Sequence, residues 1–242
     1  MWIFSSTKDY SEMVDKISHS VFVISTALLF LLSQVCNEFS QVLAKLSFGA
    51  TIEIFNIKLN LAIFYCPFIM GMLEHMFKLH DIWSSLLGIR RRFDKKIIVK
   101  EIFLQCGIKK DISKLTDEQV RKIMGTCFYK YASSTNPKID SHNITLVLTE
   151  WCWFWIILDT LILYDVVGMI WLIISWWNGR NFFVFIVIEL LLIGILILVN
   201  VTTKKYSKEE VVAILKINDR DITGDKKMEE IVKEAVKNAL SD

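Results

Sequence analysis

The chain has 242 residues, of which 53% are hydrophobic, and its 28 basic and 26 acidic side chains leave a net charge of +2. The charged residues gather in some stretches and are nearly missing from others, a segregation typical of membrane proteins and unlike a soluble globular domain. The five cysteines show no CxxC or Cys/His spacing, so we expect neither a disulfide framework nor a zinc site.

The N-terminal third of the chain predicts one membrane hairpin. The polar start carries acidic as well as basic residues, which a cleaved signal peptide would not. An apolar run over 21–35 follows, and helix continuing over 37–46 would extend it to a full crossing. A second crossing is predicted over 57–77, with a kink near Pro67.

A basic region follows, in which fourteen basic residues stand against seven acidic ones between residues 78 and 147. Asp94 is positioned to cap a helix over 95–105, and Gly107 to end it. The sequence Thr116-Asp-Glu-Gln119 resembles a capping box that opens another helix. The region therefore predicts a basic helical domain.

Two apolar runs near residues 152–175 and 182–201 predict a second membrane hairpin, because each approaches the ~20 residues that cross a bilayer as a helix. Asp140 or Ser141 is positioned to cap the first of these helices. The polar sequence at 178–181 predicts the reversal between them. Tryptophans at both ends of the first run favour the headgroup level.

The C-terminal tail predicts two amphipathic helices, one opening at Ser207 and one over 226–240, joined by a polar loop over 218–225. Their apolar faces predict packing on the basic domain or on a partner. The acidic loop lacks the register of a calcium-binding hand.

Together these patterns predict an all-α integral membrane protein with four transmembrane helices in two hairpins and a basic helical cytoplasmic domain. The excess of Lys and Arg on one side of the crossings predicts an inner-membrane protein with both termini cytoplasmic. The predicted regions are a cytoplasmic N-terminus (1–20), a first hairpin (21–77), the basic domain (78–147), a second hairpin (148–201) and a cytoplasmic tail (202–242).

Three acidic residues, Asp159, Asp165 and Glu189, lie inside predicted crossings, where an ionised carboxylate is costly without a partner or water. Asp159 and Asp165 lie roughly 240° apart around a helix, so they do not form an obvious catalytic pair. Two roles remain open. The acids line an ion or proton path, or they form hydrogen bonds between helices or subunits, which predicts a homo-oligomer.

A polar cluster, Glu74, His75, His80 and Asp81, falls where the second crossing leaves the membrane. The two histidines are five residues apart, unlike the spacing of a zinc-binding HExxH motif. Interfacial hydrogen bonding is therefore the favoured interpretation, and no metal is predicted.

The basic block, Arg90, Arg91, Arg92, Lys95 and Lys96, is placed to contact anionic membrane lipids, where each cation contributes about 1 kcal/mol. An acidic cytoplasmic protein partner is an alternative. A nucleic acid or nucleotide ligand is another, although no binding motif supports it.

In its architecture, with crossings at 21–35, 57–77, 152–175 and 182–201 around the sequence RRRFDKK, the chain resembles small multi-span membrane components of bacterial anti-phage defence systems. The resemblance implies an inner-membrane effector or anchoring subunit that couples a cytoplasmic partner to permeabilisation. The alternatives are a channel or transporter subunit and a membrane-embedded lipid-modifying enzyme. We find no catalytic motif, so we predict no catalytic residues and no cofactor.

Overall fold

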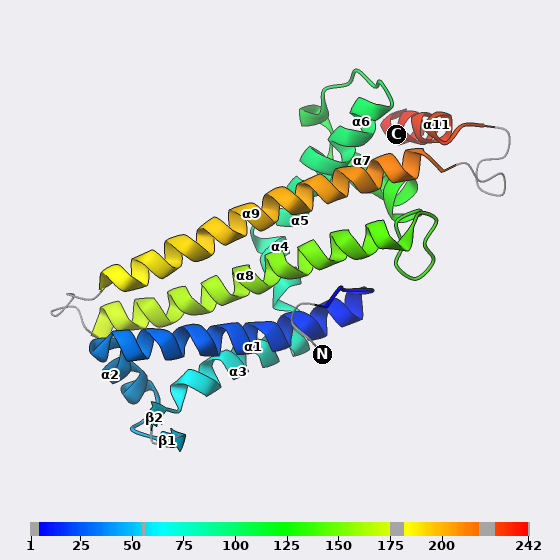
Figure 1. Ribbon diagram of the computed structural model, residues 1–242. Helices are drawn as coiled ribbons and strands as arrows, with labels where there is room; N and C mark the ends of the chain where they lie inside the picture. The colour runs from blue at the N-terminus through cyan, green and yellow to red at the C-terminus, as the bar shows by residue number, and fades with distance from the viewer. Residues whose placement is uncertain (1–4, 55–56, 175–181, 218–225, 242) are drawn as a thin grey trace. The chain divides into compact units, whose positions relative to one another are not determined.

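The computed structural model describes residues 5–54, 57–174, 182–217 and 226–241, which are nearly all α-helical (Figure 1). The chain divides into two compact units. The bundle unit contains Met1–Ser5, Val14–His80 and Cys152–Val199, and the basic unit contains Ser6–Met13, Asp81–Trp151 and Asn200–Asp242. Three long helices contribute to both units, namely α1 (Tyr10–Val35), α8 (Ser141–Ile174) and α9 (Phe182–Leu215).

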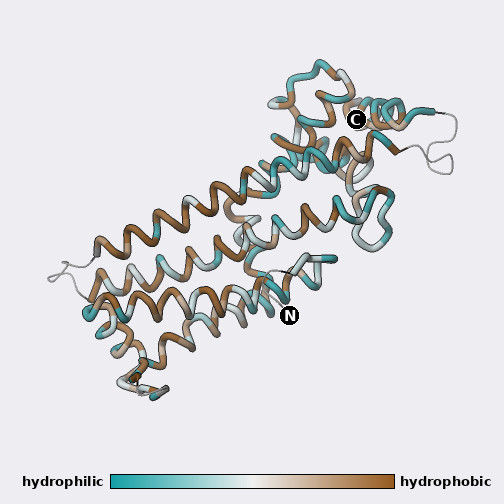
Figure 2. Tube along the Cα trace, in the orientation of Figure 1, coloured by the Kyte–Doolittle hydropathy of each residue, from teal (hydrophilic) through white to brown (hydrophobic). Residues whose placement is uncertain are grey.

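These three helices are long and apolar enough to cross a membrane, by length and composition. Their apolar character is visible as long hydrophobic stretches along α8 and the first part of α9 (Figure 2). The helix expected to provide the second of four crossings, α3 (Ala62–Phe77), has only 16 residues. It would span about 24 Å at 1.5 Å per residue, less than a full hydrocarbon core.

A β-hairpin shortens α3 and corrects the expectation of a crossing that begins at residue 57. Helix α2 (Asn37–Leu46) is separated from α1 at Cys36 and ends before Phe48 and Gly49, which both have positive φ. Strands β1 (Thr51–Ile54) and β2 (Ile57–Asn60) then pair antiparallel. Isoleucines that alternate with polar residues in both strands favour this extended conformation over a helix.

The bundle unit is held by close approaches between its helices. A Cβ on Gly71 of α3 would lie 2.8 Å from the carbonyl oxygen of Ser18 on α1, so these two backbones touch. Between α8 and α9, the Phe185 ring stacks on Tyr164 with centroids 4.2 Å apart. The same ring fills the space above Gly168, where an added Cβ would lie 2.0 Å from it.

The basic unit is built from short helices around one apolar core. In chain order they are α4 (Leu79–Leu86, which starts in the bundle unit), α5 (Ile89–Phe93), η1 (Asp94–Val99), α6 (Lys100–Gln105), η2 (Ile112–Lys114), α7 (Asp117–Ile123), η3 (Met124–Tyr129) and α11 (Met228–Ser241). Segments η1 and η3 are π-helical and η2 is a 3₁₀ turn.

Local sequence signals in this unit are confirmed in part. The Thr116 hydroxyl accepts from the Gln119 amide and the Gln119 side chain accepts from the Thr116 amide, so the predicted capping box forms. Gly107, at φ +65, follows the end of α6 as predicted. Asp94 does not cap a helix, because the helical chain already begins at Ile89, after Gly88 in the left-handed conformation.

The tail differs from the prediction in its first half. Helix α9 runs without a break through Ser207 to Leu215, because leaving an apolar environment does not interrupt backbone hydrogen bonding. The predicted loop over 218–225 lies outside the described residues, as does the predicted turn at 178–181. Helix α11 packs on the core with its apolar face, as predicted, through Met228, Val232, Val236 and Ala239.

Candidate functional site: a buried acid–histidine cluster

The turn between α3 and α4 brings Glu74 and His80 together inside the bundle unit. Lys78 caps α3 in the left-handed conformation, at φ 50, and the chain re-enters helix at Leu79. As a result, one oxygen of Glu74 accepts a hydrogen bond from the His80 amide at 3.0 Å. The other oxygen contacts His80 Nδ1 in a short hydrogen bond.

Helix α8 adds a second carboxyl group to this pair. Asp159 lies within hydrogen-bonding reach of Glu74, and neither of its oxygens has another partner among the described residues. The three side chains are 0–1% exposed. The Trp155 ring, one turn before Asp159, lies 5.7 Å from the imidazole and closes the cluster on that side. We call Glu74, His80 and Asp159 the acid–histidine cluster.

The cluster has the chemistry for holding and sharing protons. It places two buried carboxyl groups beside an imidazole, and these are the side-chain types that most often donate and accept protons in proteins. The alternative role is structural, because Glu74 also accepts a hydrogen bond from the His80 amide in the first turn of α4. That role accounts for Glu74 and His80 but not for the second carboxyl group, Asp159, that is buried against them.

Further polar groups are buried along α1 and α8. Lys16 is 1% exposed, its ammonium donates to the Ser5 carbonyl oxygen, and it lies 5.8 Å from the Trp153 ring. The hydroxyls of Ser20, Ser25 and Thr160 are buried without hydrogen-bond partners among the described residues. Ser25 and Thr160 line a hollow too small to hold a water molecule. The bundle unit therefore contains buried polar groups, but the hollow beside Ser25 and Thr160 does not provide a water-filled path between them.

The four polar residues expected at the end of the second crossing do not form one cluster. Only Glu74 and His80 are paired in the interior. His75 is exposed and lies 3.3 Å from the Asp15 carboxylate of α1. Asp81 is exposed and accepts a hydrogen bond from the Tyr10 hydroxyl at 2.6 Å. Among the described residues, no group of three or more His, Cys, Asp or Glu side chains is arranged to hold a metal ion.

The three acids expected within the crossings also separate into two sets. Asp159 belongs to the acid–histidine cluster. Asp165 on α8 and Glu189 on α9 lie near enough to each other for their charges to interact, and both are half-buried. Like charges in such a position need protonation, water or a partner. The structure thus joins Asp159 to Glu74, a pairing that spacing within α8 alone could not indicate.

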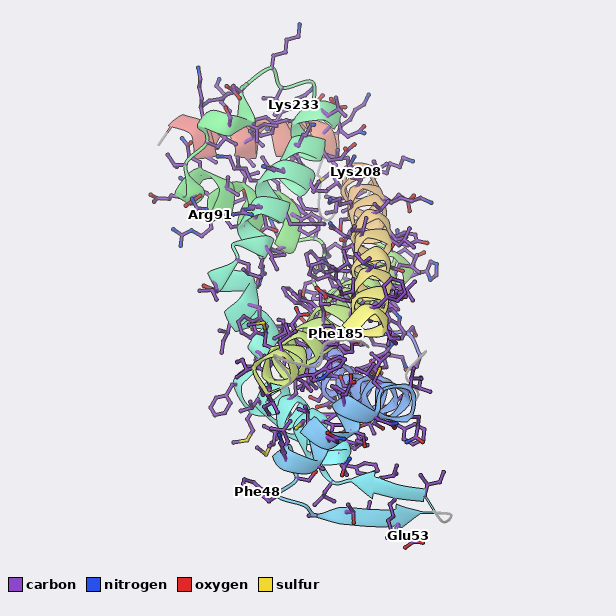
Figure 3. The ribbon with its side chains drawn as sticks, turned by 90° about the vertical axis from the view of Figure 1, so that its left-hand side faces the viewer. Phe48, Glu53, Arg91, Phe185, Lys208 and Lys233 are labelled. Carbon is purple, nitrogen blue, oxygen red and sulfur yellow. The ribbon has the colours of Figure 1, made fainter. Side chains whose placement is uncertain are left out.

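The predicted basic block lies on α5 and η1, in the basic unit, where Figure 3 labels Arg91. Arg91 forms a two-pronged ion pair with Asp117, at 2.6 and 2.7 Å. Arg90 donates to the Tyr129 hydroxyl at 3.2 Å, and that hydroxyl donates to Asp94. Burial raises the pKa of Asp94 to about 6, against the lowering influence of Arg90 and of the Tyr129 hydrogen bond.

Sequence reasoning missed Lys16 and the buried hydroxyls as members of the interior. One signal was present in the sequence, because Ser20, Ser25 and Thr160 are polar residues within or beside apolar runs. Hydroxyls are common in membrane helices, however, so that signal alone does not single out a site.

Comparison with known proteins gives one match. The chain matches the YmfE protein family over residues 9–236, a range that covers most of both units. Neither the curated proteins nor the solved structures contain a match. The acid–histidine cluster and the basic block both lie within the matched residues, and the chain belongs to the YmfE protein family.

Proposed function

We propose that this chain is an inner-membrane protein with four crossings, α1, α3, α8 and α9, and with both termini and the basic domain in the cytoplasm. The three long apolar helices support membrane insertion. Four crossings agree with the charge bias at the helix ends, because an even number returns the chain to the side on which it began. A tilt near zero and a locally thin bilayer would accommodate the short α3.

Reporter fusions test this topology. Fusions at Asn136 and after Asp242 should report a cytoplasmic location, and a fusion at Gly179, which lies outside the described residues, should report an external one. If α3 does not cross, a reporter inserted at Phe48 will lie on the same side of the membrane as the Asn136 reporter. An external Phe48 reporter together with a cytoplasmic Asn136 reporter is therefore the result that four crossings require.

Within that topology we propose a membrane subunit that couples a cytoplasmic partner to the passage of protons or ions. The observation that carries the proposal is a second carboxyl group, Asp159, which is buried against the Glu74–His80 pair and has no partner besides Glu74 among the described residues. Intramembrane ionisable groups mark proton relays and ion paths more often than they serve as inert packing. We assign the coupling to the acid–histidine cluster.

The same function requires several copies of the chain. A four-helix monomer has little room for an aqueous path, and the hollow at Ser25 and Thr160 cannot hold water. Helix α9 is largely exposed, with only 11% of its apolar window buried. We therefore propose a homo-oligomer in which lipid and neighbouring copies cover this face, and Asp165 and Glu189 contribute to the contacts.

Proton flux into proteoliposomes tests the role of the cluster. Asp159→Asn keeps a neutral polar group of nearly the same shape. It should therefore preserve assembly while lowering the rate of proton flux at least tenfold. Asp159→Leu should additionally weaken assembly. Glu53→Gln, an exposed carboxyl on β1, is the matched control and should behave as wild type. Flux that is unchanged in Asp159→Asn would show that the cluster is only structural.

The biological role we propose is that of an effector in bacterial anti-phage defence, supported by the architectural resemblance. Triggering by infection should then depolarise the membrane and arrest growth, and Asp159→Asn should remove both effects. Substrate-dependent flux without toxicity would instead indicate a transporter or channel subunit of ordinary physiology.

A further inference from the structure

The basic block contains two cations, Arg92 and Lys96, that have no hydrogen-bonding or ionic partner among the described residues. Arg91 is paired with Asp117, and the Lys95 ammonium donates to the carbonyl oxygens of Ser113 and Leu115. Arg92 and Lys96, by contrast, are exposed and have no acidic or carbonyl partner among the residues that the structure describes. These two side chains are therefore available to an anionic ligand.

Arg92 and Lys96 line one surface groove together with two exposed leucines. The groove encloses about 480 Å³, and Leu86 and Leu87 form part of its wall. Leu86 is 72% exposed and Leu87 is 47% exposed. Gly88, in the left-handed conformation, turns the chain between the leucines at the end of α4 and the cations of α5 and η1. Apolar and cationic groups thus share the wall of one hollow.

This combination fits a phospholipid better than a fully soluble anion. A free phosphate or nucleotide would contact the cations but would leave two leucines facing water. A lipid headgroup presents a phosphate to the cations and the start of its acyl chains to the leucines. The chain also keeps the groove near a membrane surface, because α4, with eight residues and a length of about 12 Å, follows directly after the apolar helix α3.

We propose that the groove of Leu86, Leu87, Arg92 and Lys96 binds the phosphate-bearing headgroup of an anionic phospholipid. The site lies outside the acid–histidine cluster and does not depend on proton movement. It rests on the membrane insertion proposed above. Release of the protein from membranes by alkaline carbonate would refute that insertion, whereas a firmly inserted protein without headgroup preference would refute the groove alone.

The test uses the full-length protein purified in a neutral detergent, with phosphatidylglycerol or phosphatidylcholine of the same acyl chains added in steps. Native mass spectrometry then gives the affinity for each lipid. The wild type should prefer phosphatidylglycerol. Each cation near an anionic surface contributes roughly fivefold, so Arg92→Gln/Lys96→Gln should weaken phosphatidylglycerol binding by roughly 25-fold and leave phosphatidylcholine unchanged.

Two further variants distinguish lipid binding in the groove from a general effect of positive charge on the protein surface. Lys109→Gln/Lys110→Gln removes the same charge from exposed positions outside the groove, so it should retain most of the preference. Leu86→Gln/Leu87→Gln should weaken both lipids alike. The proposal would be overturned if Lys109→Gln/Lys110→Gln lost as much of the preference for phosphatidylglycerol as Arg92→Gln/Lys96→Gln does.

Two competing ligands complete the design. Glycerol phosphate carries the headgroup chemistry without acyl chains, and a short nucleic acid carries phosphate without a lipid. The proposal would also be overturned if glycerol phosphate or the nucleic acid bound the wild type as tightly as phosphatidylglycerol does, and if Arg92→Gln/Lys96→Gln weakened that binding by the same factor. Weak binding of both, with tight binding of phosphatidylglycerol, is the result that the groove predicts.

Discussion

Shortening one buried valine of α11 should open the basic unit locally. Val236 is 1% exposed and belongs to the same core as Cys106. Val236→Ala removes two methyl groups at about 0.8 kcal/mol each, or about 1.6 kcal/mol before any cavity is counted. Because every 1.4 kcal/mol is a factor of ten, the fraction of molecules with α11 detached should rise roughly 15-fold.

Maleimide labelling of Cys106 measures that opening. The thiol is 2% exposed, and burial, with a smaller contribution from the Glu229 charge, raises its pKa to about 11. Both effects suppress the reactive thiolate while α11 is docked. Labelling of the full-length protein, followed by peptide mass analysis, should therefore be roughly 15-fold faster at Cys106 in Val236→Ala.

Lys237→Ala is the matched control, because Lys237 is the next residue on α11 and is exposed. Its labelling rate at Cys106 should stay within about twofold of wild type, as surface substitutions change stability by no more than about 0.5 kcal/mol. An unchanged rate in Val236→Ala, or an equal increase in Lys237→Ala, would refute the packing argument.

Three other substitutions have defined outcomes. The folded-state pKa of Asp94 is raised to about 6, so the stabilising contribution of this carboxyl is complete below about pH 4 and is lost as pH rises through 6. The thermal stability of Asp94→Asn should therefore increase relative to that of the wild type between pH 4 and 7. Gly168→Ala should cost about 1–3 kcal/mol of stability through its clash with Phe185, whereas Gly194→Ala, which meets open space, should not. Thr116→Ala should cost about 1 kcal/mol by removing the capping box, measurable as faster hydrogen exchange in the first turn of α7.

The sequence predicted those parts of the fold that depend on local patterns. Hydropathy identified the long apolar helices, and residue order at Thr116 and Gly107 identified a helix start and a helix end. It did not identify the β-hairpin at 51–60, because an apolar run has the same composition whether it forms a strand or a helix. It also predicted a crossing that ends at 201 and a separate helix from Ser207, whereas α9 is continuous, since charges mark a change of solvent and not the end of a helix.

The candidate site was predicted only as separate parts. Asp159 and Glu74 were each recognised as polar residues at costly positions, but their meeting depends on how α3 and α8 pack, which no spacing within one helix reveals. The pairing of Glu74 with His80 depends on the left-handed backbone conformation of Lys78. Lysine rarely adopts this conformation, so the sequence does not predict it. Tertiary packing, and not sequence spacing, therefore defines the acid–histidine cluster.

The two π-helical segments of the basic unit give its chain a tolerance in length. A residue is displaced by about 100° around the axis for each position gained or lost in an α-helix, so a single deletion normally turns every later side chain away from the core. In η3, tightening of the wide turn to α-helical geometry can absorb the loss of one residue, such as the exposed Thr126. Cys127 and Phe128 would then keep their places in the core, and homologues one residue shorter at this point can retain the same fold.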